Sequence, residues 1–149
     1  MASIFKRIFD IESLQKFHSK TASNHLGIEY LEVGDDYIKA RLPFDERTKQ
    51  PFGLLHGGIS CFLAEEWGSL ASVCMIGEDE NKVPIGVEIN ANHIRGVKSG
   101  WLYGKVTPIH LGRTTHILNI SLTDEKDNLV CIDDYGGGNE KITKVRLSL

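Results

Sequence analysis

The apolar and polar positions of the chain change their spacing several times, and each spacing predicts a different element. Residues 8–19 place apolar side chains three residues apart, which predicts a short amphipathic helix. Segments 27–33 and 36–42 alternate apolar and polar residues, which predicts two strands joined by a Gly-Asp-Asp turn. Polar, turn-forming residues then fill positions 43–51, so we expect a loop there.

The longest apolar segment begins at Gly57 and ends near Ile76, which predicts a helix of about 20 residues and about 30 Å. Gly77 has the position of a C-terminal cap, and charged residues follow it. After Pro84 three segments have the pattern of strands, a short apolar run follows, and the final segment alternates again and could complete the sheet. These five segments are 83–94, 99–112, 115–125, 129–132 and 141–149.

The order of these elements predicts the fold class. No alternation of strand and helix follows the long helix, which disfavours a parallel sheet. One antiparallel sheet wrapped around the single long helix buries the apolar faces of both, so we expect the α+β class. The chain shows no linker or internal repeat, and residues 1–149 are expected to form a single domain.

Composition excludes some function classes. The formal net charge of −3 is small and evenly spread, so neither nucleic acid nor an anionic membrane is an expected partner. Cys61, Cys74 and Cys131 have apolar neighbours, which is typical of reduced, packed thiols rather than a metal site. The chain has no signal-peptide pattern, and we read no apolar run as membrane-spanning, so a cytoplasmic location is expected.

Helical spacing divides the long helix into two faces. The large apolar residues gather on one face, with Trp67 at its edge: Ile59, Phe62, Leu63, Leu70, Val73 and Cys74. The opposite face carries small or polar residues: Cys61, Glu65, Gly68, Ser69 and Ser72. A face of small residues around one carboxylate is what close packing against another subunit or a ligand requires.

Two adjacent carboxylates interrupt this helix, and the pattern treats them differently. Glu65 lies on the small-residue face, one turn from Ser69, whereas Glu66 falls within the apolar arc. A buried, unpaired carboxylate is costly, so Glu66 needs a partner or a path to solvent. The alternative is that both glutamates are ordinary charges on the helix surface.

The residues that precede the helix suggest a second reactive group. Gly57 and Gly58 allow close approach of a ligand to the backbone, and N–H groups at a helix N-terminus can stabilise a developing oxyanion. A glycine-containing cap without a ligand is the alternative. Gln50, just upstream, could orient a carbonyl group or be an ordinary loop residue.

The distance between His56 and Glu65 predicts a dimer. They are nine residues apart, about 13 Å along a helix, and their side chains point in different directions. Both cannot hold one small reacting group within a single chain. If both act, the site combines His56 of one subunit with Glu65 of its partner.

Three segments together carry a family resemblance: QPFGLLHGGISCFLAEEWGSLAS at 50–72, GVEINANHIR at 86–95 and PIHLGRTTHILNISLTDEK at 108–126. This combination resembles the hot-dog-fold acyl-CoA thioesterases, most closely the 1,4-dihydroxy-2-naphthoyl-CoA and 4-hydroxybenzoyl-CoA thioesterase group. The resemblance extends from about Leu14 to about Ile132. It implies a hot-dog fold, in which an antiparallel sheet wraps around one central helix.

The resemblance also implies roles for individual residues. Glu65 becomes the catalytic carboxylate, as nucleophile or as general base for water, and the Gly57 N–H polarises the thioester carbonyl. Gln50 and His56 orient that carbonyl, and Ser69 helps to position water or substrate. A thioester needs neither metal nor cofactor for hydrolysis, and coenzyme A enters only as part of the substrate.

Contacts with coenzyme A are implied in two polar clusters, drawn from more than one subunit of a dimer or a dimer-of-dimers tetramer. The clusters are His93, Arg95 and Lys98, and His110, Gly112 and Arg113. Arginine and lysine suit phosphate groups, although solvated loop charges are the alternative.

The implied reaction is hydrolysis of an acyl-CoA thioester, first of an aromatic one such as the 1,4-dihydroxy-2-naphthoyl-CoA of menaquinone synthesis. Short- or medium-chain fatty acyl-CoA is the alternative substrate, and a non-catalytic acyl-CoA-binding module is the competing class. After Ile132 the chain departs from the family pattern. We expect its triple glycine to break the last strand or add a turn, and predict no site residue there.

Overall fold

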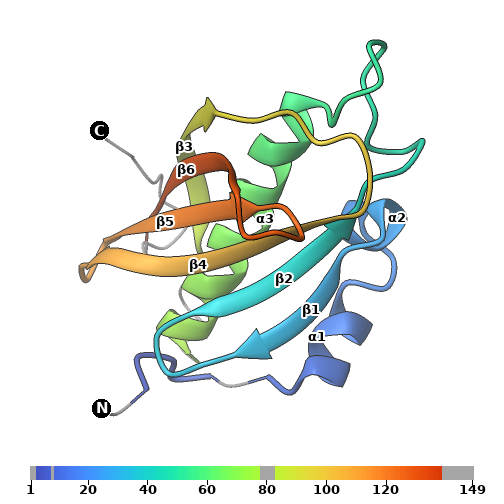
Figure 1. Ribbon diagram of the computed structural model, residues 1–149. Coiled ribbons are helices and arrows are strands. Elements are labelled where there is room, and N and C mark those ends of the chain that lie inside the picture. The colour runs from blue at the N-terminus through green and yellow to red at the C-terminus, as the bar shows by residue number, and fades with distance from the viewer. Residues whose placement is uncertain (1–2, 8, 78–82, 139–149) are drawn as a thin grey trace.

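The computed structural model describes residues 3–7, 9–77 and 83–138, and one antiparallel sheet curves around one long helix (Figure 1). The strand order is β1-β2-β4-β5-β6-β3, which leaves β1 and β3 at the edges. The strands are β1 (Glu29–Val33), β2 (Ile38–Pro43), β3 (Ile85–His93), β4 (Trp101–Leu111), β5 (Thr115–Thr123) and β6 (Leu129–Gly138). The helices are α1 (Ile11–Phe17), α2 (Ala22–Leu26) and α3 (Gly57–Ile76). The predicted hot-dog architecture is confirmed.

The N-terminal helical segment is divided into two helices, which the sequence pattern did not predict. The helix expected over 8–19 is α1, and the five residues of α2 follow it. Gly27 ends α2 with a φ of 79°, a left-handed conformation that glycine adopts without steric cost. The chain then enters β1, and the predicted hairpin of β1 and β2 is confirmed.

Strand β6 is longer than predicted, and the expectation that the triple glycine breaks it is wrong. Gly136, Gly137 and Gly138 pair with β5 on one side and with β3 on the other. Hydrogen bonding to two neighbouring strands outweighs the weak strand propensity of glycine. Tyr135 therefore lies within a central strand and is fully buried. The run KITKVRLSL lies outside the described residues.

The two predicted faces of α3 do not correspond to a buried side and an exposed side, because the sheet covers residues of both faces. Gly68 and Ser72 of the small-residue face are buried, whereas Phe62 of the apolar face is only half-buried. Trp67 is fully buried at a point of close approach between helix and sheet. A Cβ atom on Gly104 of β4 would overlap its indole ring, so this strand must carry a glycine there.

The apolar character of α3 also corrects the expectation about membrane-spanning runs. By length and composition this 20-residue helix is apolar enough to cross a membrane. In the fold, 56% of its most apolar stretch is buried against the rest of the chain. The helix is this apolar because the sheet packs around it.

Glu66 has a partner, which explains a carboxylate within an apolar arc. Its Oε1 atom lies 3.0 Å from Nε2 of His18 and accepts a hydrogen bond of 3.1 Å from the Tyr30 hydroxyl. Nδ1 of His18 lies 2.8 Å from the Leu14 carbonyl oxygen. Since both acceptors are oxygen atoms, a protonated imidazole satisfies both contacts. This network connects α1 and β1 to α3.

Burial and pairing act in opposite directions on these two groups. Burial lowers the pKa of His18, but its hydrogen bonds to Glu66 and to the Leu14 carbonyl, together with the charge of Glu66, outweigh burial and raise the pKa above the ordinary value. Burial would raise the pKa of Glu66, but hydrogen bonds from His18 and Tyr30 outweigh it and lower the pKa. Both groups are therefore charged in the range between their ordinary pKa values of 4.5 and 6.5.

Glu66→Gln should lower the free energy of unfolding by about 2 kcal/mol near pH 6, because the charged partner of His18 is lost. The deficit relative to the wild type should shrink as pH rises through the raised pKa of His18. It should also shrink as pH falls through the lowered pKa of Glu66. Urea unfolding at several pH values measures it.

Glu29→Gln is the matched control, since Glu29 forms a surface pair of 2.7 Å with Arg41. Its deficit should stay below about 1 kcal/mol at every pH. A Glu66→Gln deficit that does not vary with pH would contradict the charged pair.

Candidate active site

The first turn of α3 presents one free backbone donor. His56 is the N-cap, and its Nδ1 atom accepts the Gly58 N–H at 2.9 Å. The Gly57 N–H makes no hydrogen bond within the described part of the chain, as expected for the first residue of a helix. Their position at the helix start does not distinguish the two glycines, but in the structure the Gly58 N–H is already bonded to His56, whereas the Gly57 N–H is available for a ligand.

Gln50 lies in the turn that leads to this helix and is half-buried. Its side-chain oxygen accepts the Phe52 N–H, and its backbone N–H donates to the Leu54 carbonyl at 2.8 Å. These bonds fix the side-chain oxygen and leave the NH₂ group to donate elsewhere. The side chain has the chemistry needed to hold a carbonyl group.

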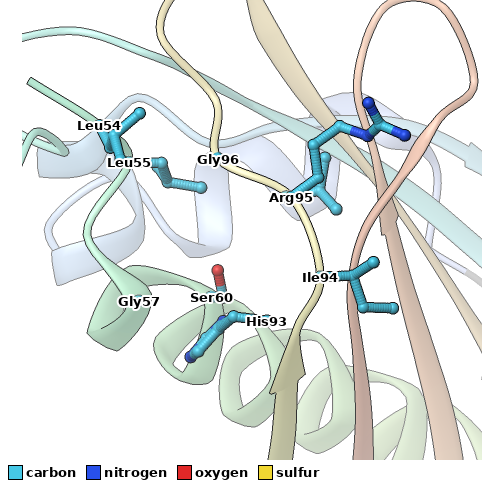
Figure 2. Close-up of a pocket in the computed structure, with 9 residues that line it drawn as sticks. Leu54, Leu55, Gly57, Ser60, His93, Ile94, Arg95 and Gly96 are labelled. Carbon is cyan, nitrogen blue, oxygen red and sulfur yellow. The ribbon is translucent and has the colours of Figure 1, made fainter.

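His93, at the end of β3, packs directly against the start of α3. A Cβ atom on Gly57 would lie 2.9 Å from Nε2 of His93, so the imidazole needs a glycine beneath it. Its Nδ1 atom is 3.2 Å from the Cys131 sulfur. Figure 2 shows His93 beside Gly57 and Ser60, whereas the Arg95 guanidinium points away from them.

Gly57 and His93 border a cavity of about 270 Å³ at the N-terminal end of α3 (Figure 2), whereas Gln50 and His56 are not among its lining residues. Its walls are both apolar and polar, and include Leu54, Leu55, Gly57, Ser60, His93, Arg95 and Val130. A helix N-terminus with a free N–H group favours the oxygen of a polarised carbonyl or an anion. The cavity can therefore receive the polar end of a small molecule.

Glu65 lies further along α3, beside the other end of β3. A Cβ atom on Gly86 would overlap its carboxylate, so the two elements touch there. Ser69 donates to Glu65 Oε1 at 3.2 Å, and the Tyr135 hydroxyl lies 3.0 Å from the Ser69 oxygen. Burial raises the pKa of Glu65, the Ser69 hydrogen bond opposes this, and the charge of Glu66 adds to the rise. A raised pKa makes Glu65 a better proton acceptor once it is ionised.

The pairing of β3 with β6 separates these two groups. His93, next to Gly57, pairs with Cys131, whereas Gly86, next to Glu65, pairs with Gly137. His93 and Gly86 are seven residues apart, which is about 23 Å along a strand. Within one chain, the free Gly57 N–H and the Glu65 carboxylate, whose pKa is raised, lie toward opposite ends of β3.

The two clusters expected to bind coenzyme A are separated in the same way. His93 and Arg95 border the cavity at the start of α3, and Lys98 borders an adjoining hollow with Arg95. The second cluster is His110, Gly112 and Arg113, at the turn between β4 and β5. His116, just after this turn, pairs with Gly137, so the turn lies at the Glu65 end of the sheet.

Two residues near these groups were not predicted as site residues. Tyr135 contacts Ser69 beside Glu65, and Cys131 contacts His93 beside Gly57. Residues 131, 133 and 135 are all buried, an alternation visible in the sequence once β6 is extended through the glycines. The expectation of a strand break after Ile132 concealed it.

The cysteines do not supply a nucleophile. All three are free; Cys74 and Cys131 are buried, and Cys61 is half-buried. Burial raises the pKa of the Cys131 thiol to about 12 and that of Cys74 to about 11, so both keep their protons. Within residues 3–7, 9–77 and 83–138, no group of three or more His, Cys, Asp or Glu side chains is placed to hold a metal ion.

Comparison with known proteins gives consistent matches. Residues 52–131 match the thioesterase superfamily. A putative esterase of Haemophilus influenzae is 45% identical over 130 residues, which are 87% of this chain and 92% of that protein. The 1,4-dihydroxy-2-naphthoyl-CoA hydrolase of Escherichia coli is 44% identical over 86% of this chain and 93% of its own length. A proofreading thioesterase of Cronobacter turicensis is 42% identical over 86% of this chain and 92% of its own length.

Solved structures agree with these matches. A thioesterase of Haemophilus influenzae superimposes with a TM-score of 0.88 at 40% identity, covering 94% of this chain and 97% of that one. A variant of a thioesterase of Pseudomonas aeruginosa gives 0.89 at 37% identity, covering 93% and 99% of the two chains.

Proposed function

The chain belongs to the thioesterase superfamily, and from that premise we propose that it hydrolyses acyl-CoA thioesters with Glu65 as the catalytic carboxylate. The observation that carries the proposal is the environment of Glu65. This half-buried carboxylate has a raised pKa, accepts from Ser69 as its one hydrogen-bond donor among the described residues, and lies against the edge strand β3 at Gly86. Glu66, its neighbour, is already paired with His18.

The reaction converts an acyl-CoA and water to a free acid and coenzyme A. Glu65 either removes a proton from the attacking water or attacks the carbonyl itself, forming an anhydride that water then hydrolyses. The Gly57 N–H stabilises the oxyanion, since it is free and lies at a helix N-terminus. Gln50 and His56 orient the carbonyl. The thiolate is a good leaving group, so the reaction needs no metal ion.

We propose an aromatic acyl group as the first substrate class, with 1,4-dihydroxy-2-naphthoyl-CoA and a role in menaquinone synthesis as its leading example. The similarity to the Escherichia coli hydrolase named for that substrate supports this choice. A short- or medium-chain fatty acyl-CoA is the alternative substrate, and a non-catalytic acyl-CoA-binding module is the competing class. A thiol-release assay with aromatic and aliphatic acyl-CoAs separates these possibilities. The proposed location is the cytoplasm.

We also propose that the working site joins two subunits. β3 is an edge strand, and Ile85 and Val87 on it are 37% and 40% exposed. Uncovered apolar edge strands are prone to pair with another chain. A twofold axis through the middle of β3 would pair it antiparallel with its copy. Gly57 and His93 of one subunit would then approach Glu65 of its partner.

The same arrangement accounts for the two coenzyme A clusters. His93, Arg95 and Lys98 of one subunit would lie near the β4–β5 turn of the other, which carries His110, Gly112 and Arg113. Their basic side chains suit the phosphate groups of coenzyme A. Two such dimers could form the tetramer that the resemblance implies.

Glu65→Gln should reduce kcat by about 100-fold or more, because an amide neither accepts the proton nor attacks the carbonyl. Glu66→Gln is the matched control on the next residue, and its kcat should stay close to the wild-type value. Thiol release measures both, and circular dichroism checks folding. Undiminished turnover in Glu65→Gln would exclude Glu65 as the catalytic carboxylate.

Mixing two inactive variants tests the shared site. Glu65→Gln and His56→Ala chains, unfolded together and refolded at equal concentration, should recover about a quarter of wild-type turnover. Half of the dimers are then mixed, and each mixed dimer contains one intact site. If each chain built its own site, no mixture would contain an intact one. Absence of recovery, with dimers present by light scattering, would contradict the shared site.

A further inference from the structure

We propose that Tyr135 is a positioning residue of this reaction: its hydroxyl donates to Ser69 and thereby directs the single proton of Ser69 to the Glu65 carboxylate. The inference rests on the proposed role of Glu65. Tyr135 itself does not touch the reacting atoms, and it acts through Ser69.

The tyrosine ring is held rigidly between α3 and the sheet. Tyr135 is fully buried and pairs with Leu118 of β5 and Ile89 of β3. Its ring packs against α3 at Gly68, where a Cβ atom would overlap the ring. The ring cannot move toward the helix, and strands on both sides hold its backbone. Its hydroxyl is therefore fixed beside Ser69.

The protons available on Ser69 and Tyr135 determine the direction of their hydrogen bonds. The Ser69 oxygen lies 3.2 Å from Glu65 Oε1 and 3.0 Å from the Tyr135 hydroxyl. An ionised carboxylate only accepts, so the one proton of Ser69 goes to Glu65. The Ser69 oxygen must then accept the proton of Tyr135. Burial raises the pKa of Tyr135 to about 12, so the phenol keeps this proton at neutral pH.

The chain of donors affects which oxygen of Glu65 is available. Oε1 is engaged by Ser69, whereas Oε2 has no hydrogen-bond partner among the described residues. Oε2 is therefore the oxygen placed to meet water or the thioester carbonyl. The donated hydrogen bond also stabilises the ionised form of Glu65, which is the active form.

Without the tyrosine hydroxyl, Ser69 has another acceptor within reach. A serine inside a helix can donate to the backbone carbonyl four residues earlier, which here is that of Glu65 itself. Tyr135 favours the carboxylate over the backbone carbonyl as the acceptor of the Ser69 proton, because the tyrosine proton approaches the Ser69 oxygen from the β6 side. Losing it should weaken the bond to the carboxylate, and the pKa of Glu65 should then rise further.

The test is the pH dependence of kcat/KM in Tyr135→Phe, which keeps the ring and removes only the hydroxyl. Activity falls as pH falls through the pKa of Glu65, so the acidic limb should move to higher pH by about half a unit. KM should change little. Ser69→Ala should move the limb in the same direction. Tyr135→Phe should add nothing in the Ser69→Ala background, since the two act through one bond to Glu65.

Tyr30→Phe is the matched control, because Tyr30 is also buried but donates to Glu66 at 3.1 Å. It should cost a similar amount of thermal stability and leave the acidic limb in place. A structural role of Tyr135 would lower stability without moving the limb. The proposal would be overturned if the acidic limb of the kcat/KM profile moved no further in Tyr135→Phe than in Tyr30→Phe.

A carbon-13 NMR titration of the Glu65 side chain keeps this test separate from the proposed function. It reports the pKa of Glu65 in wild type and Tyr135→Phe without substrate or turnover. A higher pKa in the variant supports the donor chain even if no acyl-CoA is hydrolysed. An unchanged pKa overturns it even if Glu65→Gln abolishes turnover.

Discussion

The close contact between α3 and the concave face of the sheet determines much of this structure. The sheet approaches the helix so closely that side chains are excluded at several contact points. Glycine at 104 makes room for Trp67, and glycine at 68 makes room for Tyr135. The same closeness brings Gly86 of β3 against the Glu65 carboxylate. The packing of the core and the environment of the Glu65 carboxylate therefore have one cause.

This enclosure explains why adjacent carboxylates on one helix behave differently. Glu66 turns toward α1 and β1, where His18 and Tyr30 satisfy it and its pKa falls. Glu65 turns toward β3 and β6, where the Ser69 hydroxyl is its one hydrogen-bond donor among the described residues and its pKa rises. One group contributes an ion pair to the fold, and the other keeps the raised pKa on which its proposed role depends.

The edge position of β3 connects the fold to the proposed assembly. Gly57 and Glu65 touch opposite ends of the same strand, and among the described residues no strand pairs with its outer side. A second copy paired along β3 would cover its apolar side chains and bring complementary half-sites together. Covering the edge and completing the site would then be the same event.

Local patterns in the sequence are sufficient to predict part of this fold. The bounds of α3 follow from its apolar run and from Gly77, and the β1–β2 hairpin follows from alternation and a turn signal. Family resemblance selected Glu65 over Glu66, and helix geometry separated it from His56.

Other features depend on residues that are distant along the chain and meet only in the folded protein. Glycines 136–138 remain in β6 because two flanking strands hydrogen-bond them, which no local propensity indicates. The contact of Tyr135 with Ser69 spans 66 residues, and that of Glu66 with His18 spans 48. Such pairs form only when the sheet closes around the helix, so the opposite pKa shifts of Glu65 and Glu66 depend on the tertiary structure.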